Sequence, residues 1–230
     1  MATSSVVRAD IISIGTLSRN RIWGETQPTR TPHATTTLIR SGDRKILIDP
    51  GLPPPAIGAR LFERTGLRPE QIDTVFLTNF RPAHRMGLSL FDSAQVLIHE
   101  REQESTRQGL EALLRDAPEE DLDRRQLEQE LELLERLRTP SDKIAPDVDL
   151  FPLPGYTAGT CGLLVSSPLT TLLITGDAVA TLDHFLAGQV LPDAQDIQQA
   201  QESMREVYEI ADLIIPGHDN LFLNPRTQGM

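Results

Sequence analysis

The sequence predicts an α/β (α+β) fold in which two mixed β-sheets pack against each other and helices cover their outer faces. Short β-rich segments cluster in both halves of the 230-residue chain, and a helical segment follows each cluster. No stretch of the sequence has the composition of a linker, and no internal repeat is present. We therefore expect residues 1–230 to form a single domain.

The first half is expected to contain five strands and two helices. The segments 6–14, 35–40, 45–48, 74–78 and 95–98 are rich in Val, Ile and Thr and bounded by Gly, Pro or Asp, which is typical of strands. A helix is predicted over residues 56–64, because a proline-rich segment leads into it and a glycine follows it. A shorter helix is predicted around residues 85–91.

A charged helical insertion is expected at about residues 100–143. Its leucines recur at the spacing of two amphipathic helices broken near Pro118; they are Leu110, Leu113, Leu114, Leu127, Leu131 and Leu134. The segment holds fourteen acidic and eight basic residues and so supplies −6 of the formal net charge of −11. We expect the leucines to pack onto the domain, and the alternative is an interface in a homo-oligomer or with a protein partner.

The second half repeats the pattern of strands followed by a helix. Strands are expected at 149–153, 161–166, 170–174 and 212–215, with a helix over about 194–210. Cys161 is the only cysteine, so a disulfide within the chain is impossible. Because it begins an apolar strand, we expect an inert, buried thiol.

Composition argues against several classes of partner. A net charge of −11 disfavours nucleic acid, because binding to phosphate backbones depends on Lys and Arg. No apolar run approaches the ~20 residues that a membrane span needs. Arg8 and Asp10 also interrupt any signal-peptide core near the N-terminus. We expect a cytoplasmic protein that acts on, or binds, a small molecule.

Five polar turns follow predicted strands, where the chemistry of a layered fold is usually placed. They are Asp49-Pro50-Gly51, residues 78–84 (Thr-Asn-Phe-Arg-Pro-Ala-His), Pro154-Gly155-Tyr156-Thr157, Thr175-Gly176-Asp177 and Pro216-Gly217-His218-Asp219. In this order and spacing they resemble the metallo-β-lactamase superfamily, over about residues 35–219. The resemblance implies a four-layer αββα sandwich and a hydrolase-like protein.

The resemblance also implies that the first of two metal sites is lost. The family signature Thr-His-x-His-x-Asp-His aligns with residues 78–84, and the Pro-Gly-His-Thr turn has a tyrosine in place of its histidine. The three ligand positions of the first metal are therefore Asn79, Arg81 and Tyr156. None of these is a normal zinc ligand in this setting.

The second metal site is only partly lost. Its positions keep His84, Asp177 and His218, while Ala83 stands where the family has an aspartate. Two histidines and one carboxylate with open positions suit one zinc or iron ion. The leading hypothesis is therefore a hydrolase that uses at most one metal ion.

A metal-free alternative stays open because of Arg81. If its permanent positive charge lay ~4 Å from a divalent ion, the repulsion would be roughly 8 kcal/mol at an effective dielectric constant near 20. Arg81 would then pair with Asp177 in place of a cation, and Tyr156 would add its hydroxyl to the network. In that case the chain is a pseudoenzyme whose fold serves ligand binding or protein interaction.

Three further residues have open roles. Asp49 is expected to brace the neighbouring loop by hydrogen bonds, with direct metal ligation as the alternative. His184 is interpreted as a loop residue that either packs or serves as an extra ligand or general base. Trp23 either lines the pocket or covers the core.

The candidate catalytic set is Asp177, His84, Arg81 and Tyr156. The ion would activate water, and the arginine or the tyrosine would stabilise the developing anion. The superfamily resemblance leaves the substrate open among a small ester, lactone, thioester or phosphoester.

Overall fold

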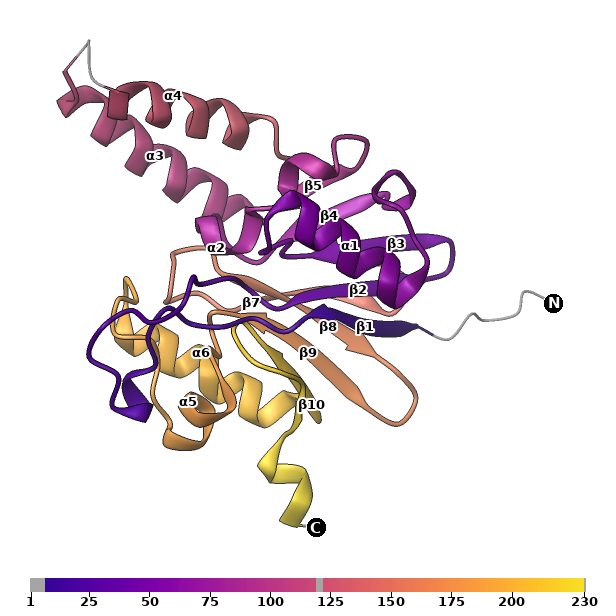
Figure 1. The fold of residues 1–230 in the computed structure, drawn as a ribbon. Coiled ribbons are helices and arrows are strands. Elements are labelled where there is room, and N and C mark those ends of the chain that lie inside the picture. Colours follow the sequence, from indigo (N-terminus) through magenta and orange to yellow (C-terminus); the bar gives the residue numbers. More distant parts are fainter. Residues whose placement is uncertain (1–6, 119–121, 230) are drawn as a thin grey trace.

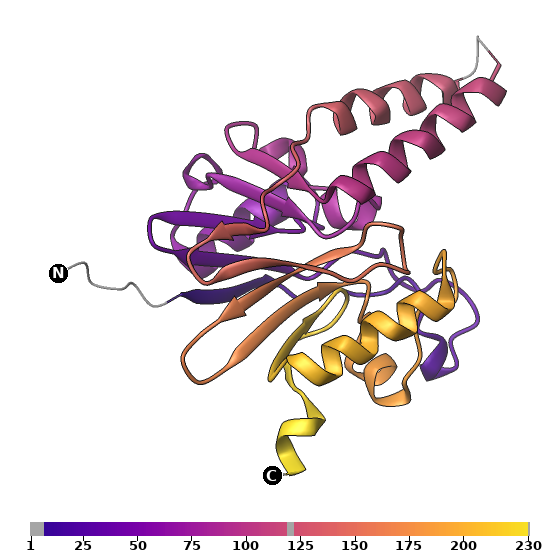
Figure 2. The same cartoon turned by 180° about the vertical axis from the view of Figure 1, so that it is seen from behind.

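The computed structural model describes residues 7–118 and 122–229. Two β-sheets lie face to face with helices on the outer side of each, as Figure 1 and the reverse view in Figure 2 show. Both sheets are mixed, because each contains parallel and antiparallel strand pairs. The four-layer αββα sandwich expected from the sequence is therefore confirmed.

The first sheet has five strands in the order β1-β2-β3-β4-β5. They are β1 (Arg8–Ser13), β2 (Thr36–Ser41), β3 (Arg44–Ile48), β4 (Thr74–Leu77) and β5 (Gln95–Ile98). Strands β1 to β3 pair antiparallel, and β3 to β5 are parallel. Parallel strands end at the same edge of a sheet, so the turns after β3 and β4 lie side by side.

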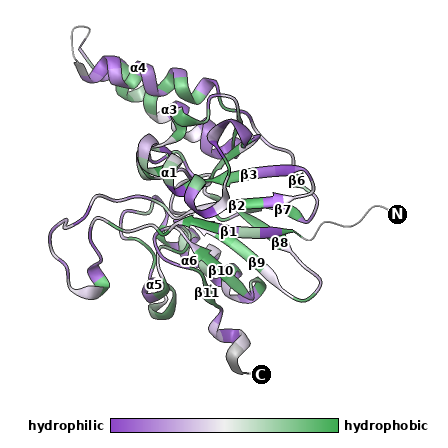
Figure 3. Ribbon diagram, turned by 45° about the vertical axis from the view of Figure 1, so that its right-hand side comes forward, coloured by the Kyte–Doolittle hydropathy of each residue, from purple (hydrophilic) through white to green (hydrophobic). Residues whose placement is uncertain are grey.

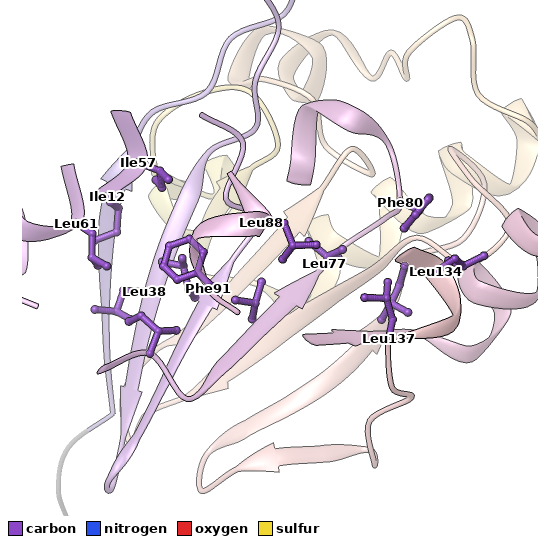
Figure 4. Close-up of a cluster of buried hydrophobic side chains, with 14 residues drawn as sticks. Ile12, Leu38, Ile57, Leu61, Leu77, Phe80, Leu88, Phe91, Leu134 and Leu137 are labelled. Carbon is purple, nitrogen blue, oxygen red and sulfur yellow. The ribbon is translucent and has the colours of Figure 1, made fainter. Parts of the chain in front are cut away.

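Helix α1 (Pro54–Thr65) covers the outer face of this sheet. Prolines at its first positions fit the geometry of a helix start, and Gly66, with a φ of 73°, ends it in the left-handed region. Apolar side chains fill the space between helix and sheet (Figure 4). Burial of each large apolar side chain contributes roughly 1.5–3 kcal/mol to the stability of the fold. This packing holds in place the strand ends that carry the polar turns.

The second sheet has six strands in the order β11-β10-β9-β8-β7-β6. They are β6 (Lys143–Ala145), β7 (Val148–Pro152), β8 (Cys161–Ser166), β9 (Thr171–Gly176), β10 (Leu213–Pro216) and β11 (Phe222–Leu223). Only the pair β9 and β10 is parallel among these described strands. Helices α5 (Leu182–Ala187) and α6 (Ile197–Ile210) cover the outer face.

A second apolar cluster joins the two sheets. It includes Ile39 and Phe76 from the first sheet and Leu163 and Ile174 from the second, all at most 2% exposed. Cys161 belongs to the same cluster and is fully buried, and burial raises the pKa of its thiol to about 12. The thiol is therefore protonated at neutral pH and inert, as its strand position predicts.

The helical insertion consists of α3 (Glu100–Asp116) and α4 (Leu122–Glu135), which extend away from the sheets (Figures 1 and 2). Hydrophilic and hydrophobic residues alternate along both helices (Figure 3). Leu134 is fully buried in the first apolar cluster and Leu110 packs against that cluster, whereas Leu113 is 57% exposed. The leucines therefore pack onto the domain only in part. An interface on the exposed face, in a homo-oligomer or with a protein partner, stays a prediction.

Several boundaries differ from the prediction. The first strand covers residues 8–13 rather than 6–14, and Val6 lies outside the described residues. Strands β6 and β11 and helix α5 were not predicted, because each is too short to show a period. The remaining short helices are η1 (Arg21–Trp23), η2 (Pro69–Gln71), α2 (Pro82–Arg85), η3 (Leu88–Leu90) and η4 (Pro225–Gly229). None of the helices in the described ranges has the length and apolar character needed to cross a membrane.

Candidate metal centre

Four polar turns meet where the parallel strand pairs of the two sheets end. The turns after β3 and β4 supply Asp49 and His84, and those after β9 and β10 supply Asp177 and His218. All four side chains are buried, with exposed fractions between 0% and 7%. Buried ionisable groups need partners, so their contacts define what this site can hold.

Asp49 and Thr78 fix the orientation of His84. One carboxylate oxygen of Asp49 accepts from the Thr78 backbone N–H at 2.9 Å, and the other accepts from the Thr78 hydroxyl at 2.7 Å. That second oxygen also lies 2.9 Å from Nδ1 of His84. Asp49 has a φ of 49°, a conformation that aspartate tolerates better than most residues. These contacts favour the bracing role for Asp49.

Asp177 lies between the two histidines. Its Oδ2 is 2.8 Å from Nε2 of His84, and its Oδ1 is 2.8 Å from Nε2 of His218. Nδ1 of His218 is in turn 3.0 Å from the backbone carbonyl of His33, which orients the ring. Gly176, with a φ of 53°, permits this turn, since a Cβ there would lie 2.4 Å from the hydroxyl of Thr78.

The electrostatics of the cluster are those of a buried charge pair. Burial by itself lowers the pKa of His84, but the neighbouring Asp177 and Asp49 carboxylates outweigh burial and raise that pKa to about 10. Burial raises the pKa of Asp177, but His84 and His218 hold it well below its usual range. Without a bound cation, His84 is therefore protonated at neutral pH, and its positive charge offsets one of the two buried carboxylate charges.

The donor set fits a metal ion. His84, Asp177 and His218 each offer one ligand atom, and these atoms lie within 4.8 Å of one another. Oδ1 of Asp177 is buried and has no hydrogen bond from the residues that the structure describes, although Nε2 of His218 lies 2.8 Å from it. Each histidine has its other ring nitrogen held by a carboxylate or a carbonyl, the usual support of a ligating imidazole.

The residues that the sequence places at the lost ligand positions contact other protein groups: Asn79 contacts the ligand cluster, and Arg81 and Tyr156 contact each other. The side-chain amide of Asn79 donates to Oδ2 of Asp177 at 2.9 Å. The guanidinium carbon of Arg81 lies 5.1 Å from the ring centroid of Tyr156, a cation–π contact. The Tyr156 hydroxyl donates to Asp193 at 3.3 Å.

The ion pair between Arg81 and Asp177, which the metal-free alternative predicts, is wrong. Within the described ranges, Asp177 pairs with His84 and His218, and no ion pair joins it to Arg81. Asp177 is already surrounded by two imidazoles and the Asn79 amide, so the arginine finds a better partner in the Tyr156 ring. The charge that balances Asp177 comes from His84 itself.

A cavity of about 560 Å³ opens onto the cluster. Its wall includes the four candidate catalytic residues Asp177, His84, Arg81 and Tyr156, together with His218. His184 also lines it, from helix α5 rather than from a loop as expected. Burial lowers the pKa of His184, and its Nδ1 lies 2.8 Å from the Thr181 hydroxyl.

Trp23 does not line this cavity and does not cover the core. Its side chain is 61% exposed, and its ring N–H donates to Asp183 at 2.5 Å. This bond links the loop between β1 and β2 to helix α5. Both expectations for Trp23 are therefore wrong, because its indole N–H finds a carboxylate at the surface.

Sequence reasoning missed several contributors. Thr78 and the carbonyl of His33 orient the histidines, yet neither residue type signals such a role in a sequence. Glu102 of α3 was counted only as one of the acidic residues of the insertion, but it is 2% exposed and accepts from Phe80 N–H, Thr157 Oγ1 and Gly159 N–H. Its position four residues after the end of β5 was the one available signal.

With this geometry established, comparison with known proteins defines the class. The chain belongs to the metallo-beta-lactamase superfamily, whose family model matches residues 30–218. A curated relative, the 7-methyl-GTP pyrophosphatase of Burkholderia thailandensis, is 40% identical over 70 residues, which cover 25% of this chain and 33% of that protein. The match thus spans about a third of that relative's length.

Solved structures show the same fold. A Thermotoga maritima protein classed with the metallo-beta-lactamases matches with a TM-score of 0.68 and 18% identity, covering 95% of this chain and 100% of that one. The dizinc quorum-quenching lactonase AidC gives 0.66 and 16%, with coverage of 83% and 74%. B. thuringiensis AiiA, in a variant with N-decanoyl-L-homoserine bound at its active site, gives 0.63 and 18%, with 94% of each chain covered.

Proposed function

We propose that this protein is a hydrolase that uses a single metal ion, zinc or iron, held by His84, Asp177 and His218. The observation that carries the proposal is the convergence of one ligand atom from each of these three buried residues within 4.8 Å of one another; Oδ1 of Asp177, moreover, has no hydrogen bond among the described residues. Superfamily membership and the lactonases among the structural neighbours support hydrolysis of a small ester, lactone, thioester or phosphoester. The chemistry that such an ion supplies is activation of water and polarisation of a carbonyl or phosphoryl oxygen.

Arg81 and Tyr156 take the place of the second ion in stabilising negative charge. Arg81 is a permanent cation on the cavity wall. Burial and the nearby Asp177 carboxylate raise the pKa of Tyr156, so its hydroxyl stays protonated and donates a hydrogen bond. Both groups are in contact and face the same cavity, which suits them to hold an oxyanion next to the ligand cluster.

Metal content tests the proposal directly. Plasma mass spectrometry on protein purified without chelator, and again after incubation with zinc or iron(II), is expected to give about one ion per chain. His84→Ala and His218→Ala should each abolish uptake while circular dichroism shows a folded protein. His99→Ala is the control, because His99 lies at the start of α3 and outside the ligand cluster. Wild-type protein that stays free of metal would overturn the proposal.

Binding is also expected to release a proton. Because the pKa of His84 is about 10 without an ion, the imidazole must lose its proton to become a ligand at pH 7.5. Calorimetric titration with zinc in two buffers of different ionisation enthalpy should therefore report release of about one proton per ion. A buffer-independent binding enthalpy would contradict this protonation state.

Restoring the lost positions offers a complementary test. A variant carrying Asn79→His, Arg81→His, Ala83→Asp and Tyr156→His recreates the family's ligand pattern and is expected to bind two ions per chain. A folded quadruple variant that binds no more metal than the wild type would show that these turns do not occupy the family's ligand positions.

One observation favours a second candidate, a metal-free ligand-binding protein. Protonated His84 lies within 2.9 Å of both Asp177 and Asp49, so these three groups form ion pairs with one another without any metal ion. The cavity would then bind a ligand without hydrolysing it. Metal content near zero combined with a folded, ligand-binding protein is the outcome that supports this candidate over the hydrolase.

A further inference from the structure

The cavity over the metal-ligand cluster has an arginine-rich wall in a strongly acidic chain. Three of its lining residues are Arg19, Arg21 and Arg81, and its acidic lining residues are Asp177 and Asp193. Asp177 lies at the base between two histidines, so its charge is already balanced. The wall is thus predominantly positive, although the chain as a whole has a net charge of −11.

These arginines are not committed to acidic partners. Among the described residues, none of the three has a carboxylate within ion-pairing distance. Arg19 donates through Nη1 to the Thr26 carbonyl at 3.0 Å, which positions its head without neutralising it. Arg81 lies on the Tyr156 ring, which holds the guanidinium in place and leaves its charge intact.

The loop that carries Arg19 and Arg21 is built to hold them beside the site. Within this loop the Glu25 carboxylate forms an ion pair with Arg30, and not with Arg19 or Arg21. The Asn20 side chain accepts from the Ile22 N–H at 3.0 Å at the start of η1. The bond from Trp23 to Asp183 then fastens the loop to α5. Figures 1 and 2 show the loop on the same side of the molecule as α5 and α6.

We propose that Arg19, Arg21 and Arg81 form an anion-binding subsite, and that the substrate carries a carboxylate or phosphate group. This inference rests on the proposed function, because it places the scissile bond at the histidine cluster. It narrows the role of Arg81, which binds the anionic group of the substrate and leaves the Tyr156 hydroxyl to stabilise the charge that develops at the cluster. Guanidinium groups supply several N–H donors in a planar arrangement that matches the oxygens of either anion. A neutral ester or lactone would leave three cations beside the site without a counter-charge.

Direct binding measurements test the subsite independently of catalysis. Calorimetric titrations of chelator-treated and metal-supplemented protein would use inorganic phosphate and glutarate, with trimethyl phosphate and dimethyl glutarate as neutral counterparts. We expect the chelator-treated protein to bind at least one of the two anions, more weakly as salt rises, and neither neutral compound. The tighter of the two anions identifies phosphate or carboxylate as the preferred group. Absence of binding by both anions would overturn the inference.

Two substitutions with opposite expected effects sharpen the test. Arg21→Gln should weaken anion binding at least about tenfold, the loss of one hydrogen bond to a charged group. Asp193→Asn removes a negative charge from the same wall, retains an acceptor for Tyr156, and should tighten binding. Arg60→Gln is the control, since Arg60 lies on exposed α1 and pairs with Glu63. Unchanged affinity in Arg21→Gln and Asp193→Asn would place the anion elsewhere.

The outcomes also separate this inference from the proposed function. Anion binding by a protein that never takes up metal supports the subsite and rejects the one-metal hydrolase. Uptake of one ion without anion binding by the chelator-treated protein supports the hydrolase and rejects the subsite.

Discussion

At the scale of single residues, the centre depends on hydrogen bonds that hold the ligands from behind. Thr78 is the common point: its backbone and hydroxyl both donate to Asp49, and the hydroxyl lies 3.1 Å from Nδ1 of His84. It also lies beneath Gly176, next to the turn that carries Asp177. One side chain therefore supports ligands from both sheets.

Thr78→Val is expected to weaken zinc binding about tenfold or more, in the range seen when the partner of a ligating histidine is lost. The substitution keeps the shape of the side chain but leaves a buried Asp49 oxygen with one donor fewer. Competition with a fluorescent zinc chelator measures the affinity. Thr78→Ser retains the hydroxyl and should bind nearly as tightly as the wild type. Equal weakening by serine and valine would show that packing, rather than the hydroxyl, matters.

The ion pair between Arg81 and Asp177, which the metal-free alternative predicted wrongly, also depends on a single side chain. The position of Arg81 in the signature could be read from the sequence, but the direction of its long side chain could not. That direction is set by Tyr156, which is distant in sequence and supplies a ring face. Two imidazoles and the Asn79 amide contact the Asp177 carboxylate, whereas Arg81 contacts the Tyr156 ring.

At the scale of elements, the helical insertion is tied to the site through Glu102. Its carboxylate accepts from the loop after β4 and from the loop before β8, the two loops that carry Arg81 and Tyr156. Close packing accompanies these bonds, because a Cβ on Gly159 would lie 1.9 Å from the Glu102 backbone nitrogen. The first turn of α3 therefore fixes the spacing of the cation–π pair.

Glu102→Ala should lower the free energy of unfolding by about 2–4 kcal/mol, because it leaves buried donors on both loops without an acceptor. Urea denaturation followed by circular dichroism measures this loss. Glu104→Ala is the matched control on the same helix, since Glu104 is exposed, and its change should stay within about 0.5 kcal/mol. Similar values for the two variants would mean that Glu102 does not anchor the insertion.

The sequence predicted the longer strands and helices and missed the shortest ones. Strands with a clear β-rich composition and turns with characteristic residues were found, and their order predicts both the fold and the convergence of His84, Asp177 and His218. Strands β6 and β11 and helix α5 escaped prediction, because two to six residues are too few to show a period. Arg19, Arg21 and Asp193 reach the cavity through long-range folding of loops, which no local pattern encodes.

At the scale of the whole molecule, the cluster links the two sheets by charge as well as by packing. Asp49 and His84 belong to turns of the first sheet, and Asp177 and His218 to turns of the second. The ion pair between His84 and Asp177 therefore crosses the interface that the apolar cluster between the sheets also holds. Stability of the metal-depleted protein should consequently depend on the protonation of His84.

The sign of this dependence follows from the pKa of His84, which is raised to about 10 in the folded protein from about 6.5 in an unfolded chain. The folded state thus binds the proton more tightly, so the stabilisation is complete below about pH 6.5 and is lost as the pH rises through 10. Asp177 acts in the opposite direction: its pKa is lowered, and its contribution is lost only when the pH falls below the usual range of a carboxyl.

Urea unfolding of the metal-depleted protein should therefore show greatest stability at about pH 4.5–6.5, and a decline of up to about 1.4 kcal/mol per pH unit between pH 7 and 9.5. His84→Gln lacks the titrating group, so it should be less stable at pH 6 and show a flatter profile over the same range. Zinc should add more stability at pH 8.5 than at pH 6, because the ion replaces the proton on His84. Parallel profiles for the wild type and His84→Gln would show that protonation of His84 does not stabilise the contact between the two sheets.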